Sequence, residues 1–212
     1  MNYFVSPSGL IKRVFDGSVW DSKQNKILLT FDDSPTKGVT EIILQKLKKE
    51  KLKGVFFCIG EKANDSPELI REILREGHTI GNHTFSHKSL LFNLSRRKME
   101  KEITTVNKLF NEKFDYNIRL FRPPYGRFNF LLLPILRREN MTNVMWSVLT
   151  LDYKNNINLV KFTVQKYLIN NSIVVLHDNL KSSGIIIQAI DAVINEAKNR
   201  GFEIGDPAEC LR

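Results

Sequence analysis

The sequence has little cysteine and no long apolar run. Only Cys58 and Cys210 occur among the 212 residues, which is too few for a disulfide framework or a four-cysteine zinc site and favours a reducing compartment. Cys58 lies inside the apolar stretch 55–59, where a thiol usually packs as a small hydrophobic group. No stretch approaches the roughly eighteen consecutive apolar residues of a membrane-spanning helix, so we expect no such helix.

The first residues lack the features of an export signal. Polar residues interrupt the apolar ones throughout 1–20, which leaves no continuous apolar core and no small-residue cleavage site. We therefore expect a cytoplasmic protein, and we expect it to be monomeric. Residues 1–25 are predicted to be irregular and to pack as an extension on a single domain formed by residues 26–212.

Acidic residues are outnumbered by basic ones. The chain has 32 Lys and Arg against 23 Asp and Glu, a formal charge of +9 that can attract nucleic acid, anionic lipid or acidic glycan. Many of these lysines lie between residues 46 and 53, as expected for the solvated face of a helix and the loop after it. No nucleic-acid-binding motif accompanies the charge, so we expect no nucleic-acid partner.

Segments of strand type and helix type alternate along the chain. Short apolar runs predict strands at 27–31, 55–59, 79–80, 120–121, 144–148, 173–176 and 202–204. Helical spacing of apolar residues predicts helices at 42–53, 66–77, 95–111, 129–138, 158–167 and 184–198. This alternation predicts an α/β fold built on a mainly parallel sheet or barrel.

Two adjacent carboxylates follow the first predicted strand, in the segment 30–35, Thr-Phe-Asp-Asp-Ser-Pro. Neighbouring side chains on an extended backbone point to different sides, so Asp32 and Asp33 can reach different partners, such as a metal ion and a reacting water. The plainer interpretation is a turn in which both carboxylates cap local backbone N–H groups. Further polar clusters follow other strands, and in parallel α/β folds such loops converge on one edge.

His83 and His87 are separated by four positions. One helical turn, or a tight turn between a strand and a helix, can aim both imidazoles at one point. Thr84 stands where a zinc metalloprotease helix would have Glu, so the pair is not that signature. A carboxylate from another strand end would complete the three ligands of an open zinc site. For His78 we expect a structural or supporting role.

A set of short motifs follows in a recognisable order. They are Thr30 to Pro35, His83 to His87, Arg122 to Tyr125, Asp152-Tyr153 and Leu176-His177. Over about residues 26–204 the chain resembles the polysaccharide deacetylases of carbohydrate esterase family 4, which share the NodB homology domain. The resemblance implies a distorted, incomplete (β/α) barrel.

The resemblance also implies a role for each matching residue. Asp33, His83 and His87 would hold a divalent metal, most simply Zn²⁺, with Co²⁺ or Ni²⁺ as alternatives. Asp32 would be the catalytic base, and Arg122 would hold its carboxylate in place.

The remaining implied roles concern the substrate. The backbone N–H of Tyr125 would stabilise the oxyanion, and Tyr125 and Trp146 would contact the substrate. His177 would protonate the departing amine, with Asp152 raising its pKa and fixing its tautomer. Leu176 would line a small pocket for the acetyl methyl group.

The chain departs from the family pattern at three positions. Ser34 replaces a glycine, and if that position required a positive φ the loop would be strained. Tyr153 replaces the usual tryptophan, which should alter a groove wall more than the chemistry. Leu149 stands where many members have an acidic residue, which leaves Asp152 as the nearby group to tune His177. No implied ligand, base or acid is lost, so we predict an active enzyme.

The function predicted from the resemblance is removal of N-acetyl groups from N-acetylglucosamine-type units of a polysaccharide or glycan precursor, with release of acetate. One alternative is an O-acetyl esterase, because the same groups serve both reactions. A second is a non-catalytic basic module that binds a glycan or a nucleic acid.

Overall fold

The computed structural model describes residues 5–89 and 95–211, within which the strands form one nine-stranded sheet. Neighbouring strands pair in parallel, in the order β1-β6-β5-β4-β3-β2-β8-β7, and β9 pairs with β2. The strands are β1 (Ser18–Val19), β2 (Lys26–Ser34), β3 (Val55–Cys58), β4 (Thr79–Asn82), β5 (Leu120–Phe121), β6 (Thr142–Val144), β7 (Val148–Leu149), β8 (Ile173–His177) and β9 (Glu203–Ile204).

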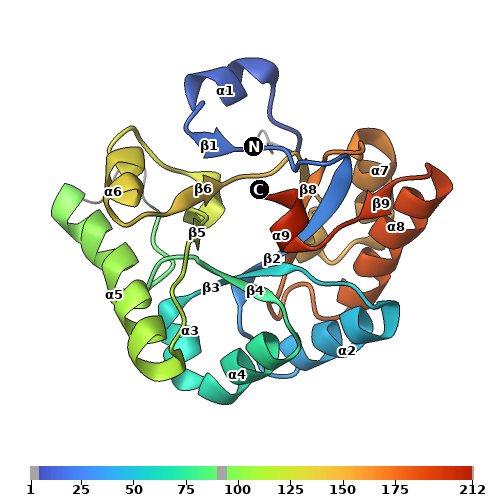
Figure 1. Ribbon diagram of the computed structural model, residues 1–212. Helices are drawn as coiled ribbons and strands as arrows, with labels where there is room; N and C mark the ends of the chain where they lie inside the picture. The colour runs from blue at the N-terminus through green and yellow to red at the C-terminus, as the bar shows by residue number, and fades with distance from the viewer. Residues whose placement is uncertain (1–4, 90–94, 212) are drawn as a thin grey trace.

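Most of the helices lie in an arc outside the strands, and the short C-terminal helix α9 lies inside that arc (Figure 1). The helices are α1 (Gly9–Val14), α2 (Thr40–Glu50), α3 (Gly60–Asp65), α4 (Pro67–Arg75), α5 (Arg96–Phe114), α6 (Leu132–Arg138), α7 (Ile157–Tyr167), α8 (Ile186–Asn199) and α9 (Pro207–Cys210). Two 3₁₀ turns, η1 (Pro124–Gly126) and η2 (Asp152–Lys154), follow β5 and β7.

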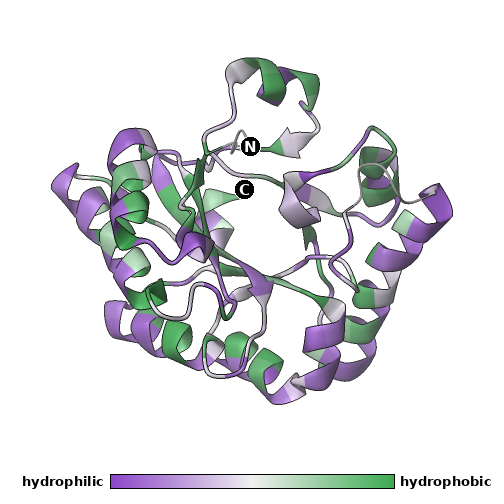
Figure 2. Ribbon diagram, turned by 180° about the vertical axis from the view of Figure 1, so that it is seen from behind, coloured by the Kyte–Doolittle hydropathy of each residue, from purple (hydrophilic) through white to green (hydrophobic). Residues whose placement is uncertain are grey.

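The core lies between the sheet and the outer helices. Figure 2 shows hydrophilic colour mainly on the outward sides of these helices and hydrophobic colour toward the strands. The central strand β2 is apolar from Ile27 to Leu29, and all three side chains are fully buried. Burial on both faces is typical of a parallel strand covered by helices on one side and enclosed on the other.

The sheet curves into a half-barrel that does not close. Its two end strands, β1 and β7, are not neighbours in the strand order. On the β7 side, the N–H of Leu149 donates to the carbonyl of Val5; on the β1 side, the N–H of Met145, which follows β6, donates to the carbonyl of Val19. The predicted α/β fold, an incomplete (β/α) barrel, is confirmed.

The two ends of the barrel differ. Helix α9 lies at the amino ends of the strands, where Glu209 bonds Lys26 at the start of β2. The polar motifs lie at the opposite, carboxyl ends of β2, β4, β5 and β8. In parallel α/β folds that rim is where binding loops gather.

Several predicted boundaries need correction. The prediction that residues 1–25 are irregular is wrong for α1 and β1, and β1 pairs with β6; residues 1–4 lie outside the described part of the chain. Helix α3 was not predicted, because its six residues are too few for a periodic pattern. Strand β2 extends beyond Phe31 through both aspartates to Ser34.

The predicted strand 144–148 is wrong as a single element. Strand β6 ends at Val144 and β7 begins at Val148, because β6 pairs with β5 whereas β7 pairs with β8. The chain therefore crosses between separated strands at residues 145–147, and Trp146 lies in this crossing. The predicted helix 129–138 begins later, at Leu132.

Within residues 5–89 and 95–211, no helix combines the length and the apolar character that crossing a membrane requires.

Replacing Gly81 with alanine should destabilise the fold. Gly81 pairs with Phe57 across β4 and β3, and a Cβ on Gly81 would lie 2.4 Å from the ring carbons Cδ1 and Cε1 of Phe57. We expect Gly81→Ala to reduce the free energy of unfolding by about 1–3 kcal/mol, measured by urea denaturation. Gly9→Ala is the matched control, since nothing lies within 4 Å of a Cβ at Gly9; equal effects of the two substitutions would contradict this account.

Candidate active site

The candidate site lies where adjacent strands end. Asp32 and Asp33 are in the last residues of β2, His83 follows β4 directly, and Arg122 follows β5. His177 is the last residue of β8 and is the register partner of Asp32 across the β2–β8 pairing. Parallel pairing therefore brings together residues that are far apart in the sequence.

Three of the predicted residues bring their ligating atoms together in one cluster. Asp33 Oδ1 lies 3.0 Å from His87 Nε2 and 3.7 Å from His83 Nε2. One ligating atom from each of the three residues lies within 4.8 Å of the others. A carboxylate oxygen and two imidazole nitrogens are the donor set of an open zinc site, so these residues fit a divalent metal.

His83 is held in the tautomer that metal binding requires. Its Nδ1 lies 2.7 Å from the carbonyl oxygen of Arg122, which can only accept, so Nδ1 carries the proton and Nε2 faces the cluster with a free lone pair. Burial lowers the pKa of His83 to about 4, which keeps the ring neutral. Of the two forms considered for residues 83–87, one helical turn is wrong, because no helix includes them and Thr84 and His87 have positive φ; the segment is a turn that follows strand β4.

The Asp33 carboxylate is ionised. Burial opposes its charge, but the hydrogen bond from His87 and the nearby imidazoles hold the pKa of Asp33 well below its usual range. Its backbone has φ of 69°, a left-handed conformation uncommon outside glycine. Ser34 itself does not have a positive φ, so the strain considered for a serine at this position does not arise, and Ser34 is fully buried within β2.

Asp32 points away from Asp33 and pairs with a fully buried arginine. Arg122 Nη1 donates to Asp32 Oδ1 at 2.8 Å. The rest of the guanidinium donates to Thr30 Oγ1, Val144 O and Met145 O at 2.7–2.8 Å and lies 4.2 Å from the centre of the Phe57 ring. Four hydrogen bonds fix the guanidinium in place, so the Asp32 carboxylate that it binds is held in one orientation.

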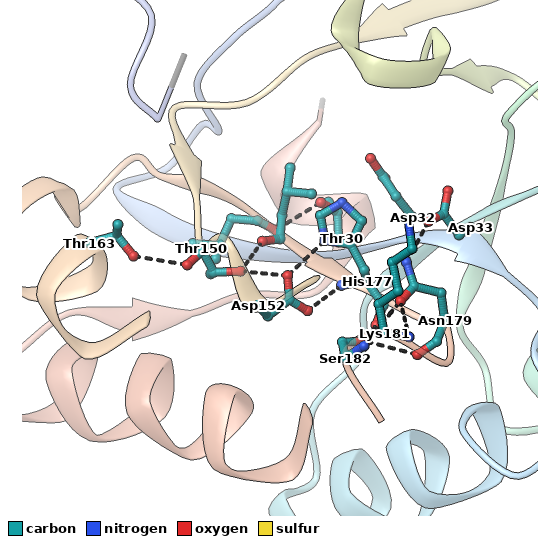
Figure 3. A network of polar contacts seen from close by, with 12 residues as sticks. Thr30, Asp32, Asp33, Thr150, Asp152, Thr163, His177, Asn179, Lys181 and Ser182 are labelled. Carbon is teal, nitrogen blue, oxygen red and sulfur yellow. Dashed lines mark hydrogen bonds and ion pairs between the residues drawn. The ribbon is translucent and has the colours of Figure 1, made fainter. Parts of the chain in front are cut away.

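His177 is paired with Asp152, as the motif order predicts. Its Nδ1–H donates to Asp152 Oδ1 at 2.7 Å, and its backbone N–H donates to Asp152 Oδ2 at 2.7 Å. Burial would lower the pKa of His177, but the charge and hydrogen bond of Asp152 raise it to about 9. Figure 3 shows Thr150 and Asp152 on one side of His177 and Asn179 and Asp33 on the other.

Sequence reasoning missed several residues that support the site. Thr150 Oγ1 bonds Asp152 Oδ1 at 3.0 Å, Asn179 Nδ2 donates to Asp33 Oδ2 at 2.7 Å, and Lys62 Nζ donates to the Asp33 carbonyl at 2.7 Å. Asn179 stands two positions after His177 at a strand end, a signal that was available. Lys62 gave none, because it comes from the unpredicted helix α3.

The predicted substrate contacts differ in exposure. Tyr125 is 62% exposed, has φ of 59°, and its ring lies 4.8 Å from that of His87. Trp146 is only 7% exposed and packs beneath Gly126, where a Cβ would lie 2.2 Å from the indole. Leu176 is fully buried. Substrate contact by Leu176 and Trp146 therefore stays a prediction.

The structure also places three further residues that the sequence analysis singled out. Tyr153 lies with its ring 4.9 Å from that of His177, edge-on, so it does border the site. Leu149 is in β7, where its N–H bonds Val5 O, and Asp152 is the carboxylate that reaches His177. His78 accepts from the N–H of Gly54 and contacts the Phe56 ring, which supports its structural role.

Comparison with known proteins gives consistent matches. A family model described as polysaccharide deacetylase matches residues 21–144. Two peptidoglycan-N-acetylglucosamine deacetylases of Bacillus cereus are 32% and 31% identical, over 83% and 91% of this chain. The chain spans 64% of the length of the first and 92% of the second.

Solved structures agree with the fold. The Bc1960 peptidoglycan N-acetylglucosamine deacetylase superposes with a TM-score of 0.86 at 28% identity, over 93% of this chain and 95% of that one. A CE4 family pseudoenzyme from Bacillus anthracis superposes with a TM-score of 0.83 at 23% identity, over 92% of this chain and 69% of that one. At that identity the second likeness shows the fold alone.

Asp178 should make stability depend on pH. Its buried carboxylate accepts a hydrogen bond from Thr40 Oγ1 at 2.6 Å, yet burial raises its pKa to about 7, above the ordinary value for an aspartate. Because the pKa of Asp178 is higher in the folded than in the unfolded protein, its contribution to the free energy of unfolding is fully present below about pH 4. That contribution is lost as pH rises toward 7.

We therefore expect the free energy of unfolding to decrease less between pH 5 and pH 8 in Asp178→Asn than in the parent protein. Urea denaturation of the two metal-free proteins across this pH range measures the difference. Parallel pH profiles for the two proteins would contradict this expectation.

Proposed function

The chain belongs to the polysaccharide deacetylase family, and from that premise we propose that it is a metal-dependent hydrolase acting on N-acetylglucosamine-type units of a polysaccharide or glycan precursor. It would release acetate and leave a free amine. One observation carries the proposal: the Asp33, His83 and His87 cluster lies beside both an Asp32–Arg122 pair and a His177–Asp152 pair. A hydrolase of this kind needs that combination of ligands, base and acid.

The metal would be held by Asp33 Oδ1, His83 Nε2 and His87 Nε2, with Zn²⁺ as the simplest candidate and Co²⁺ or Ni²⁺ as alternatives. When bound, such an ion polarises the acetamide carbonyl and lowers the pKa of a water molecule. Both imidazoles come from one loop and the carboxylate from β2, so the site is assembled only in the folded chain.

The chain's own residues would move the protons. Asp32 would take a proton from the attacking water, and Arg122 would keep its carboxylate aimed at that water. The backbone N–H of Tyr125 would donate to the oxyanion of the tetrahedral intermediate. His177, with its raised pKa, would give its proton to the departing amine nitrogen.

The relatives' names support the substrate class. Two of them are named as peptidoglycan-N-acetylglucosamine deacetylases, which are N-acetyl glycan hydrolases. The N-acetyl preference and a cytoplasmic, monomeric state stay predictions for this chain.

The first test is acetate release from N-acetylglucosamine oligomers by metal-stripped protein, with and without added Zn²⁺ or Co²⁺. Activity should return with metal, and Asp32→Asn should lower kcat by about 10²–10⁴-fold, since the base is lost while the ligands stay. Acetylated xylan in parallel assays identifies an O-acetyl esterase. Metal binding with no turnover on any acetylated sugar would overturn the proposal in favour of a binding module.

Asp152→Asn should change the pH profile as well as the rate. An amide cannot stabilise the charged imidazolium, so the pKa of His177 should fall from its raised value. The acid form of His177 would then be lost at lower pH, and the alkaline limb of the kcat/KM profile should move to lower pH. If Asp152→Asn lowers the rate but leaves the alkaline limb in place, this role for Asp152 is refuted. Thr163→Val is the control, because Thr163 donates to the carbonyl of Thr150 and lies two contacts further from His177 than Asp152 does.

A further inference from the structure

Asp33 is fixed from two sides by residues that none of the motifs contains. Lys62 Nζ, on α3, donates to the Asp33 carbonyl oxygen at 2.7 Å and to Thr36 Oγ1 at 2.9 Å. These bonds restrain the backbone of Asp33 in its left-handed conformation. With the backbone restrained, the rotation of the carboxylate is what decides which oxygen faces the histidines.

Asn179 restrains the rotation of the Asp33 carboxylate. Its Nδ2 donates to Asp33 Oδ2 at 2.7 Å, whereas Oδ1 of Asp33 faces His87 Nε2 at 3.0 Å. One carboxylate oxygen is thus occupied by a protein donor and the other is left for the cluster. Figure 3 shows Asn179 in the loop after β8, close to Asp33.

The orientation of the Asn179 amide is itself determined. Its Oδ1 accepts from the backbone N–H groups of Lys181 and Ser182 at 3.0 and 3.1 Å. Both partners are donors, so the atom that faces them must be the oxygen, and the NH₂ group must face Asp33. The turn after β8 therefore aims a hydrogen-bond donor at the metal-ligand carboxylate.

We propose that Asn179 is a positioning residue that makes Asp33 a one-oxygen metal ligand by holding Oδ2 and leaving Oδ1 directed at the site. This inference rests on the proposed metal site and adds a residue to it. A partner that orients a ligating carboxylate contributes to metal affinity without touching the metal.

The test is a double-mutant cycle on Co²⁺ affinity, read from the visible absorption of metal-stripped full-length protein titrated with cobalt. Asn179→Ala should weaken Co²⁺ binding by about 10- to 100-fold. In an Asp33→Ala background the same substitution should have almost no further effect, because the carboxylate through which Asn179 acts is gone. Lys181→Ala, in the same loop and with an exposed side chain, should leave the affinity unchanged.

A general disturbance of the loop gives a different pattern. It would weaken Co²⁺ binding equally in both backgrounds, and that result would overturn the proposal, as would an unchanged affinity in Asn179→Ala. Thermal unfolding of the metal-free variants identifies any that fail to fold; Asn179→Ser then repeats the cycle with a smaller change to the turn. Failure of the parent protein to bind cobalt would instead overturn the proposed metal site.

Discussion

The buried guanidinium of Arg122 is the interaction on which the site depends. A fully buried charge is tolerated only when it is paired and hydrogen-bonded, and Arg122 meets that condition through Asp32, Thr30 and two backbone carbonyls. These partners come from β2, from the last residue of β6 and from the crossing that follows it. The Arg122 side chain therefore joins the central strand to the crossing at residues 145–147. Removing either member of the Asp32–Arg122 pair would leave a buried charge without its partner.

The backbone of Arg122 has a separate effect. Its carbonyl fixes the tautomer of His83, so the proposed base and one proposed metal ligand are oriented by the same residue. On the other side of Asp32, the parallel register places His177 opposite it on β8. The arrangement of base, acid and ligands thus follows from strand order. Arg122 sets the direction of Asp32 and His83, and Asp152 sets that of His177.

Much of this could be predicted from the sequence because the signals are local. The alternation of strands and helices predicted the α/β fold class, and the family resemblance carried by the motifs implied the pairing of Asp32 with Arg122 and of His177 with Asp152. The boundaries at residues 144–148 could not be predicted, because a mainly apolar run does not show that the chain changes sheet neighbours within it. Helix α1 and strand β1 were missed because elements this short show little periodicity. The two residues of β1 form a strand because they pair with β6, which is far away in the sequence.

The sequence by itself determined which residue types stand after each strand and therefore which chemistry the rim can perform. Only the tertiary structure decided how those side chains are held. The left-handed backbone of Asp33, the donors from Lys62 and Asn179 and the burial of Leu176 all depend on contacts between residues far apart in the chain. Local patterns carry no information on such contacts, because they form only when the sheet sets the distance between its strand ends.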